Sequence, residues 1–467
     1  MPKHYFAAMT RNTVSLAGTA LVVGSLTLMV SLIAIQMIGL RGGAYMGIIT
    51  FIVMPTVLFV GLVLIFAGIR RERKRGERVT EGDEGRFPIL DLNLERTRKA
   101  VVGVIGVSTV SVVILAAATY QGIHVMDSTP FCGTVCHTVM QPEFTAHQRS
   151  PHARVACADC HIGPGADWFV KSKLSGAWQV VSVAFGLYPS PIPTPIENLR
   201  PARDTCEQCH WPTTHIGDTL KVKTVYTDDE PNTELKTAVL LKVGGLAGRE
   251  SSGIHWHVNP EIQIRYRANH DRQIIYDVEL TDADGNVKVF KPEEETPEDA
   301  SDWRVMDCID CHNRPTHRYR LPMDEVDEAM AKGYMDKTLP YLKRESMRVL
   351  EAQYIGHEEA KAAIARELRQ FYQENYPDVA DAKNAEIEKA IRELEIIYTS
   401  NVFPDMDVTW GTYPDNSGHF DSPGCWRCHD RKHKAEDGKK ISRNCGMCHT
   451  ILAQEEEEPE ILDTLNP

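Results

Sequence analysis

The chain begins with three long apolar segments, and its pattern changes after the third. The segments are Asn12–Leu40, Gly42–Ile69 and Ala100–Ile123, and none of them contains a charged residue. Each is longer than the roughly 20 residues that a helix needs to cross the hydrocarbon core of a bilayer. The pattern therefore predicts three transmembrane helices. A cleavable signal peptide is the alternative for the first segment, because Lys3 and Arg11 precede it.

Positive charge gives these helices an orientation. The connector 70–99 holds ten Lys and Arg residues, whereas the link between the first two segments holds only Arg41. Because basic loops stay on the cytoplasmic side, the connector and the N-terminus are expected in the cytoplasm. The third helix then delivers everything after residue 123 to the periplasmic side of a bacterial inner membrane.

The rest of the chain shows two other periodicities. Alternating apolar and polar residues over Ile262–Tyr266 and Tyr276–Leu280, with a turn at Gly285, predict a small antiparallel sheet. Apolar residues at helical spacing over Ile364–Tyr372 and Ile387–Tyr398 predict two helices with one buried stripe each. The region after the membrane segments is therefore expected to be mostly α-helical with a β insert.

Three other stretches have a distinct amino-acid composition. Gly163–Leu187 mixes apolar, aromatic and basic residues, which suits a helix at a membrane surface, with a core helix as the alternative. Tyr188–Pro201 contains five prolines and is expected to be an extended segment. The run Glu455–Glu458 predicts a solvated, disordered tail.

Charge narrows the possible partners. After residue 123 the chain has 38 Lys and Arg against 57 Asp and Glu. This negative field argues against nucleic acid as a partner and favours salt-dependent docking of cationic protein surfaces. Solubility alone is the other explanation of the same charge.

All twelve cysteines occur in pairs that are followed at once by histidine. Five pairs have the spacing Cys-x-x-Cys-His, and the first, at Phe131–Met140, has three residues between its cysteines. The six sites are Cys132, Cys136 and His137; Cys157, Cys160 and His161; Cys206, Cys209 and His210; Cys308, Cys311 and His312; Cys425, Cys428 and His429; and Cys445, Cys448 and His449.

This pattern is typical of covalently bound c-type haem. Two thiols bond to the two vinyl groups of one porphyrin, and the adjacent imidazole binds the iron. Zinc ribbons also pair cysteines, and a disulfide framework suits the same compartment, but neither requires the trailing histidine. The sequence therefore predicts six haems.

Other histidines can supply the second axial ligand of each iron. Eleven histidines lie outside the motifs on the outer side, more than the six irons require, so bis-histidine ligation and electron transfer are the default expectation. The segment Ile254–Val258, as a strand, would point two of these imidazoles to one face. The favoured candidates are His147, His152, His255, His257, His317, His419 and His433.

Residues 109–210 resemble the NapC/NirT family of membrane-anchored multihaem cytochromes c. The resemblance lies in a membrane helix, the first motif with Met140 after it, the Ser150-Pro151-His152 sequence, and the second and third motifs. It implies a quinol dehydrogenase that passes electrons to a periplasmic cytochrome or reductase, with menaquinol as the expected substrate. The whole chain is similar to longer, three-helix relatives with added haems, such as inner-membrane cytochromes of metal respiration.

The resemblance also implies roles for individual residues. Met140 would be the axial ligand of the first haem, and Lys173 or Lys171 with Asp167 would line the quinol pocket. The lysines could instead extend toward lipid head groups. The chain departs from the family at the first motif, where the extra residue requires either a bulge or a cysteine that is not bonded to haem.

These observations predict an ordered set of units and three possible functions. A quinol dehydrogenase is favoured over a terminal reductase of a nitrogen or sulfur oxyanion and over a passive haem subunit of a larger complex. The units are a membrane anchor over 1–123, a triple-haem region over 124–210, the β insert over 211–307, a fourth haem with helices over 308–424, a two-haem unit over 425–453 and an acidic tail over 454–467.

Overall fold

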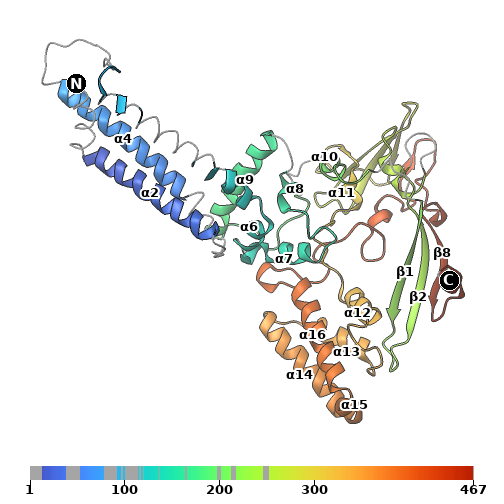
Figure 1. Cartoon of the computed structure of the whole chain (residues 1–467). Helices are drawn as coiled ribbons and strands as arrows, with labels where there is room; N and C mark the ends of the chain where they lie inside the picture. The colour runs from blue at the N-terminus through green and yellow to red at the C-terminus, as the bar shows by residue number, and fades with distance from the viewer. Residues whose placement is uncertain are drawn as a thin grey trace. The chain divides into compact units, whose positions relative to one another are not determined.

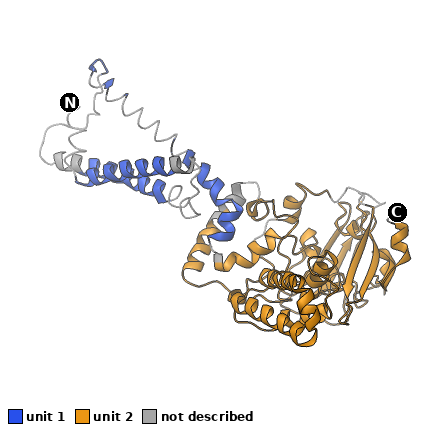
Figure 2. Cartoon of the chain, turned by 60° about the horizontal axis from the view of Figure 1, so that its bottom comes forward, with its two compact units in different colours: residues 1–135 blue, residues 136–467 orange. Residues whose placement is uncertain are grey.

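The computed structural model describes most of the chain outside the N-terminal segments and connector. The described residues are 13–37, 53–77, 92–95, 98–99, 102, 114, 117–118, 120–135, 137–162, 166–196, 201–211, 217–245 and 252–465. The chain divides into two compact units, Met1–Val135 and Cys136–Pro467 (Figure 2).

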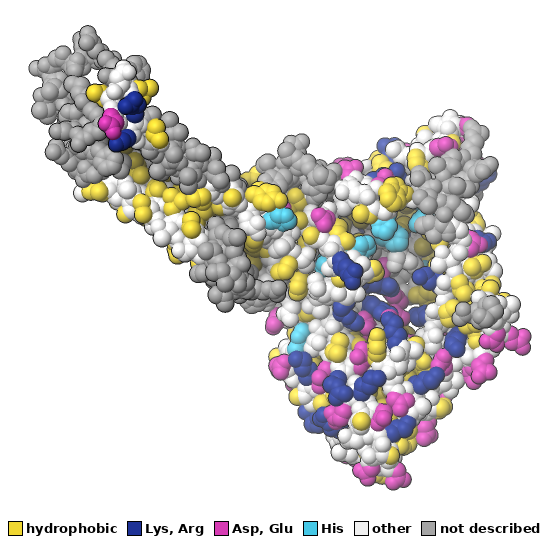
Figure 3. All heavy atoms as spheres, in the orientation of Figure 1, with side chains coloured by type: hydrophobic (Ala, Val, Ile, Leu, Met, Phe, Trp, Pro, Cys, Tyr) yellow, Lys and Arg dark blue, Asp and Glu magenta, His cyan; other side chains and the backbone are white. Residues whose placement is uncertain are grey.

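Unit 1 is built around two apolar helices, α2 (Thr13–Met37) and α4 (Met54–Glu77), which pack side by side (Figure 1). Gly18 and Gly61 lie at their contact, where a Cβ atom on Gly18 would come within 2.6 Å of the Gly61 carbonyl oxygen. Both helices are long and apolar enough to cross a membrane, and only 22% and 17% of their apolar windows are buried. Hydrophobic side chains accordingly cover the visible described surface of these helices (Figure 3).

Most of the third predicted span, Ala100–Ile123, lies outside the described residues. Residues 120–126 are helical, and the short helix α6 (Thr129–Thr134) follows. Ser128 caps α6, because its hydroxyl accepts a hydrogen bond from the Phe131 amide at 3.3 Å. This helix carries Cys132, the first cysteine of the first motif.

Unit 2 combines helices with two antiparallel sheets (Figure 1). The order β1-β2-β8 forms one sheet and β6-β3-β4-β5-β7 the other. The longer helices are α7 (His137–Gln148), α9 (Ala166–Ala184), α12 (Pro322–Ala331), α13 (Leu342–Leu350), α14 (His357–Asn375), α15 (Pro377–Ala382), α16 (Asn384–Asn401) and α17 (Glu460–Leu465). The strands are β1 (Asp218–Tyr226), β2 (Glu234–Lys242), β3 (Gln263–Ala268), β4 (Ile275–Thr281), β5 (Val287–Lys291), β6 (Arg304–Val305), β7 (Lys434–Ala435) and β8 (His449–Glu456).

The helices α12–α16 enclose the largest hydrophobic core. Ile364 and Leu368 of α14 and Ile391 and Leu394 of α16 are among its most buried members. The predicted stripes of these two helices are confirmed, since apolar residues four apart fall on one face of a helix. Tyr226 at the end of β1 completes this core, which joins the helices to the three-stranded sheet.

The predicted sheet is also confirmed, as β3, β4 and β5. Tyr266 pairs with Val278 and Ile264 with Leu280, and a register shift near Ala268 moves the end of β4 by one residue. Two strand pairings were missed by the sequence interpretation, the β1–β2 hairpin and the addition of β8 to it. β8 also makes the prediction of a disordered tail wrong, because Glu456 pairs with Lys236 and α17 follows.

The helix α9 has little contact with the rest of the described chain. Its apolar side chains Leu174, Trp178 and Val180 are 69%, 62% and 63% exposed, and Phe185, just after it, is 74% exposed. A core helix would bury these residues, so the core-helix alternative is wrong. The proline-rich segment after α9 contains no helix or strand over its described residues 188–196, as predicted.

Candidate haem-binding sites

Each of the five regular motifs forms about one helical turn. The turns are α8 (Cys157–His161), α10 (Ala202–Cys206), α11 (Cys308–Cys311), η4 (Gly424–Arg427) and η5 (Cys445–Met447). In three of them the histidine amide donates back to the carbonyl of the first cysteine, at 2.8 Å for His210, 2.8 Å for His312 and 3.1 Å for His429. Residues i, i+3 and i+4 share one face of a helical turn, so both thiols and the imidazole lie on the same side.

The first motif differs from these five. Cys132 lies on α6 in unit 1, whereas His137 and Met140 lie on α7 in unit 2. Cys136 and the side chain of His137 are outside the described part of the chain. The predicted ligands of the first haem therefore stay predictions.

Four motif imidazoles each face an imidazole from elsewhere in unit 2. An iron between two imidazole nitrogens, at about 2 Å from each, separates the ring centroids by roughly 6 Å. The centroid separations are 6.2 Å for His161 and His317, 6.0 Å for His210 and His152, 5.8 Å for His429 and His257, and 6.1 Å for His449 and His419. The side chains present therefore fit bis-histidine ligation at four motifs.

Main-chain carbonyl groups orient several of these rings. Nδ1 lies 3.0 Å from the Glu143 oxygen in His317, 2.8 Å from the Ile254 oxygen in His257 and 2.5 Å from the Ser442 oxygen in His429. A carbonyl oxygen only accepts, so Nδ1 carries the proton and Nε2 keeps the lone pair that an iron needs.

The Ile254–Val258 segment is a 3-10 helix, η2, and the prediction of a strand is wrong. Residues two apart in a 3-10 helix point in different directions, whereas in a strand they would share a face. His257 accordingly faces His429, while His255 lies near His312. Burial and the neighbouring His312 lower the pKa of His255, whose buried Nδ1 has no hydrogen-bond partner in the described chain.

His147 and His433 are both buried, but their ring nitrogens differ. In His147, Nε2 lies 3.0 Å from the Val155 carbonyl oxygen, and Nδ1 lies 3.4 Å from the Gln148 amide nitrogen. In His433, Nδ1 lies 3.0 Å from Asp430 Oδ1, and the buried Nε2 has no hydrogen-bond partner among the described residues. His433 thus keeps a nitrogen for an iron, whereas both nitrogens of His147 are engaged.

Successive motifs lie close together in space. α8 contacts α10, and α10 contacts α11. The thiols of Cys206 and Cys308 are within hydrogen-bonding reach, and Cys425 lies close enough to Cys311 and Cys448 to interact electrostatically. The order of the motifs in the sequence is therefore also their order in the fold, from the second motif to the sixth.

Charged residues inside and beside the motifs connect them, and no sequence pattern indicates these contacts. Asp307 accepts from the amides of Ala202 at 3.0 Å and Cys308 at 2.6 Å, which joins the third motif to the fourth. Arg427 donates to the Asp310 carbonyl at 2.6 Å, which joins the fifth motif to the fourth. In the sequence, Asp310 and Arg427 occupy the second x position of their Cys-x-x-Cys-His motifs, which the motif leaves unspecified.

Gly424 positions the fifth motif. It has φ +45°, and a Cβ atom there would overlap the Gly418 carbonyl, which accepts from the Cys425 amide at 3.1 Å. Gly424→Ala is therefore expected to displace Cys425 and lower the haem content by up to one per chain, measured as bound haem per protein. Gly438→Ala is the matched control, because Gly438 has φ +79° but open space around its Cβ position.

The polar groups near the motifs also fit haem. Arg314 Nη2 is a buried donor with no acceptor in the described chain, and a haem propionate would supply one. Among the described residues, no three His, Cys, Asp or Glu are placed to hold a metal ion directly, and no disulfide joins the described cysteines. These placements give no support to the zinc and disulfide alternatives.

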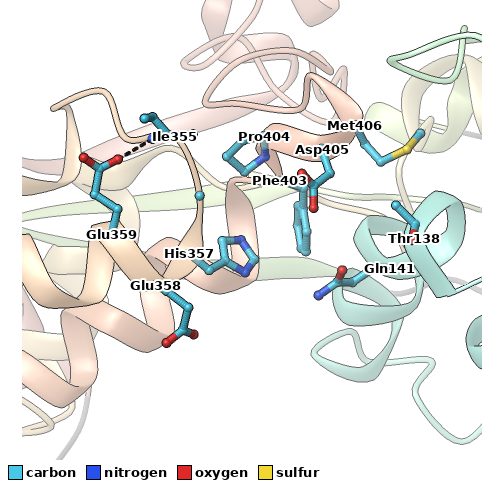
Figure 4. Close-up of a pocket in the computed structure, with 11 residues that line it drawn as sticks. Thr138, Gln141, Ile355, His357, Glu358, Glu359, Phe403, Pro404, Asp405 and Met406 are labelled. Atoms are coloured by element: carbon cyan, nitrogen blue, oxygen red, sulfur yellow. Dashed lines mark hydrogen bonds between the residues drawn. The ribbon is translucent and has the colours of Figure 1, made fainter.

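A cavity of about 530 Å³ lies in unit 2 beside the start of α7 (Figure 4). Phe403 and Met406 give it an apolar wall, and His357 and Gln141 project from opposite sides. His357 Nε2 lies 2.6 Å from the Val402 carbonyl oxygen. The lining also includes Thr138, which directly follows the first motif histidine.

The quinol-pocket candidates lie on α9. Lys171 is exposed, and the side chains of Lys173 and Asp167 are outside the described part of the chain. The structure thus places all three on the helix with the exposed apolar surface and leaves their roles as predictions.

Helical turns that present two thiols and an imidazole, repeated along a chain with apolar helices, define a multihaem c-type cytochrome with a membrane anchor. Residues 94–191 match the NapC/NirT cytochrome c family, N-terminal region. The chain is 42% identical over 451 residues to the cytochrome c-type protein ImcH of Geobacter sulfurreducens, covering 96% of this chain and 89% of that protein. No solved structure matches it. The chain belongs to the NapC/NirT family of membrane-anchored cytochromes c, which bind c-type haem covalently and transfer electrons.

Proposed function

We propose that this protein oxidises membrane quinol, with menaquinol as the substrate, on the periplasmic side of the inner membrane and passes the electrons to periplasmic cytochromes or reductases. The carrying observation is the order of the motifs, which follow one another in the fold as in the sequence. Such an order, from the second motif to the sixth, suits stepwise electron transfer from one haem to the next. Six c-type haems would supply the one-electron chemistry.

We propose bis-histidine ligation for the second to sixth haems. His161 pairs with His317, His210 with His152, His312 with His255, His429 with His257, and His449 with His419. The free Nε2 of the buried His433 makes it the competing ligand near the fifth motif. Such pairs leave no open iron position, which favours electron transfer over a terminal reductase.

On the quinol side, α9 is the element that the proposal relies on. Its exposed apolar residues suit a position at the membrane surface, where a quinol head group is accessible. Lys171, Lys173 and Asp167 would hydrogen-bond the quinol hydroxyl groups, and Asp167 would accept a proton. Protons released there leave on the periplasmic side. At the first haem, Met140 would be the axial ligand beside His137 and would raise the potential.

Quinol reduction of the purified full-length protein tests this function. We expect a menaquinol analogue to reduce the detergent-solubilised protein, and Lys173→Ala to slow that reduction about tenfold or more without loss of haem. Lys221→Ala, on an exposed part of β1, is the matched control and should leave the rate unchanged. If the fully haem-loaded protein is not reduced, the passive-subunit alternative holds instead.

A further inference from the structure

One short loop serves three of the haem-binding sites. It runs from Cys311 to His317, directly after the fourth motif. His312 belongs to that motif, the Pro315 carbonyl oxygen lies 3.4 Å from Nδ1 of His152, and His317 faces the second motif. The loop thus joins the region that matches the NapC/NirT family to the part of the chain that follows it.

Among the imidazoles of the five proposed ligand pairs, His317 has a carboxylate beside Nδ1, a feature that it shares with the competing ligand His433 and its Asp430. Its Nδ1 lies 3.0 Å from the main-chain oxygen of Glu143 and also 3.0 Å from the carboxylate Oε2 of the same residue. Only the main-chain oxygen has the geometry of a hydrogen bond, and the buried Oε2 is left without one. The main chain therefore orients the ring, while the carboxylate contributes a negative charge next to it.

Arg314 and two tyrosines hold this carboxylate in place. Arg314 Nη1 lies 3.8 Å from Glu143 Oε1, and the arginine side chain is only 8% exposed. Its guanidinium lies 3.9 Å from the ring centroid of Tyr413 and 5.9 Å from that of Tyr319. Tyr413 in turn donates to the Ile192 carbonyl at 2.9 Å. Stacking on the tyrosine rings thus holds the guanidinium of Arg314 next to Glu143, which belongs to α7.

The charge of Glu143 follows from these neighbours. Burial opposes a charge on Glu143, whereas the guanidinium of Arg314, 3.8 Å from Oε1 and itself nearly buried, favours it. An iron-bound imidazole is neutral, but its Nδ1 still carries a proton and Arg314 keeps its positive charge. The ion pair with Arg314 is therefore the contact that keeps a negative charge next to His317.

We propose that Glu143, held by Arg314, lowers the reduction potential of the haem bound by His161 and His317, and so sets that haem apart from the other bis-histidine sites. A carboxylate next to Nδ1–H makes the imidazole a stronger electron donor, which stabilises ferric iron over ferrous iron. Glu143 does not bind the iron but acts through the imidazole of His317, so it is a positioning residue. The inference rests on the ligand pairing proposed above and is independent of whether quinol is the electron donor.

The same contacts indicate what the region after the fourth motif contributes to the haem bound by His161. Glu143 and His161 lie within the part of the chain that matches the family, whereas Arg314 and His317 lie beyond it. The added region thus supplies both the second axial ligand and the cation that fixes the charge beside it. In this way it adjusts a haem of the shared region as well as adding haems of its own.

Glu143→Gln in the full-length haem-loaded protein tests the proposal. Glutamine keeps the size of the side chain and the main-chain oxygen, so only the charge near Nδ1 is lost. We expect the equilibrium constant for reduction of one haem to rise about tenfold, which is about 59 mV for one electron, with the other potentials unchanged. Chemical reductant titration followed by absorbance gives the potentials, and electron paramagnetic resonance should show a shifted low-spin signal for the same haem.

Two further variants separate charge from packing. Glu143→Asp keeps the charge and should retain wild-type potentials. Glu325→Gln removes a carboxylate that is more buried than Glu143 and contacts Arg149 at 2.9 Å, and it should shift the potentials much less. Unchanged potentials in Glu143→Gln, or a shift no larger than in Glu325→Gln, would overturn the proposal. If Glu143→Gln is recovered without its full haem content, Glu143→Asp decides: wild-type potentials support a role for the charge, and haem loss there too refutes it.

Discussion

Replacing Asp310 by alanine is expected to destabilise unit 2 by about 3–5 kcal/mol, because it removes one partner from a buried ionic network. The carboxylate side chain is 3% exposed. It accepts from the Tyr266 hydroxyl at 2.6 Å, from Arg304 Nε at 3.0 Å and from the Asp307 amide at 2.7 Å. Without it the buried donors lose their acceptor, and two arginines, Arg304 and Arg272, are left side by side.

The expected effect reaches the haem sites as well as the sheet. Asp310 stands between the two cysteines of the fourth motif, and Tyr266 belongs to β3, so the carboxylate fastens that motif to the five-stranded sheet. A urea titration followed by haem absorbance should show an earlier transition for Asp310→Ala. Asp437→Ala is the matched control, because its ion pair with Lys288 is exposed to solvent and its loss should change stability little. Equal urea midpoints for the two variants would contradict the expectation.

The parts of unit 2 that the sequence could predict are those fixed by local pattern. Ile364 and Leu368, like Ile391 and Leu394, are four residues apart, and this spacing alone places each pair on one buried face. In the β3–β4 hairpin, the alternation of apolar and polar residues around Tyr266 and in the partner strand likewise indicates which side chains share a buried face. Each motif is equally local, because cysteines three apart with a following histidine need only one helical turn.

The parts that could not be predicted depend on distant segments. β2 contains a single fully buried position, Ala238, so no alternation of buried and exposed residues marks this strand. Its partner β8 comes from the other end of unit 2, so the local sequence does not indicate the pairing. The acidic residues of β8 suggested disorder, yet main-chain pairing with β2 gives that segment its structure. Ile254–Val258 forms a 3-10 helix in which no residue is fully buried, so its local sequence lacks a stripe of apolar residues that would indicate the conformation.

The two proposed ligands of each iron also differ in whether a local sequence pattern indicates them. The motif histidines follow from spacing, but the facing histidines come from elsewhere in the chain, as His317 does for His161. Counting spare histidines gave a set of candidates without pairing them. It also kept His147, which only the structure distinguishes, through its two engaged ring nitrogens. Glu143 and Asp310 carried no local signal, because each acts through a contact formed by folding.

His317→Ala is therefore expected to convert one haem from low-spin to high-spin and to raise its potential. The facing imidazole, with its ring centroid 6.2 Å from that of His161, supplies the sixth ligand in the proposed pair. His147 lies nearby, with ring centroids 6.4 Å from His317, but its hydrogen bonds to Val155 and Gln148 hold both nitrogens. Absorbance and electron paramagnetic resonance spectra of the resting protein would detect a single high-spin haem.

His147→Gln is the matched control, because it removes a neighbouring buried imidazole of the same size class. We expect every low-spin signal to persist in that variant, with at most a loss of stability of about 1–3 kcal/mol from the broken hydrogen bonds. The opposite result, a high-spin haem in His147→Gln and none in His317→Ala, would assign the ligand to His147. Glu143 would then no longer be next to an iron ligand, so this pair of variants also tests the basis on which the tuning of that haem was inferred.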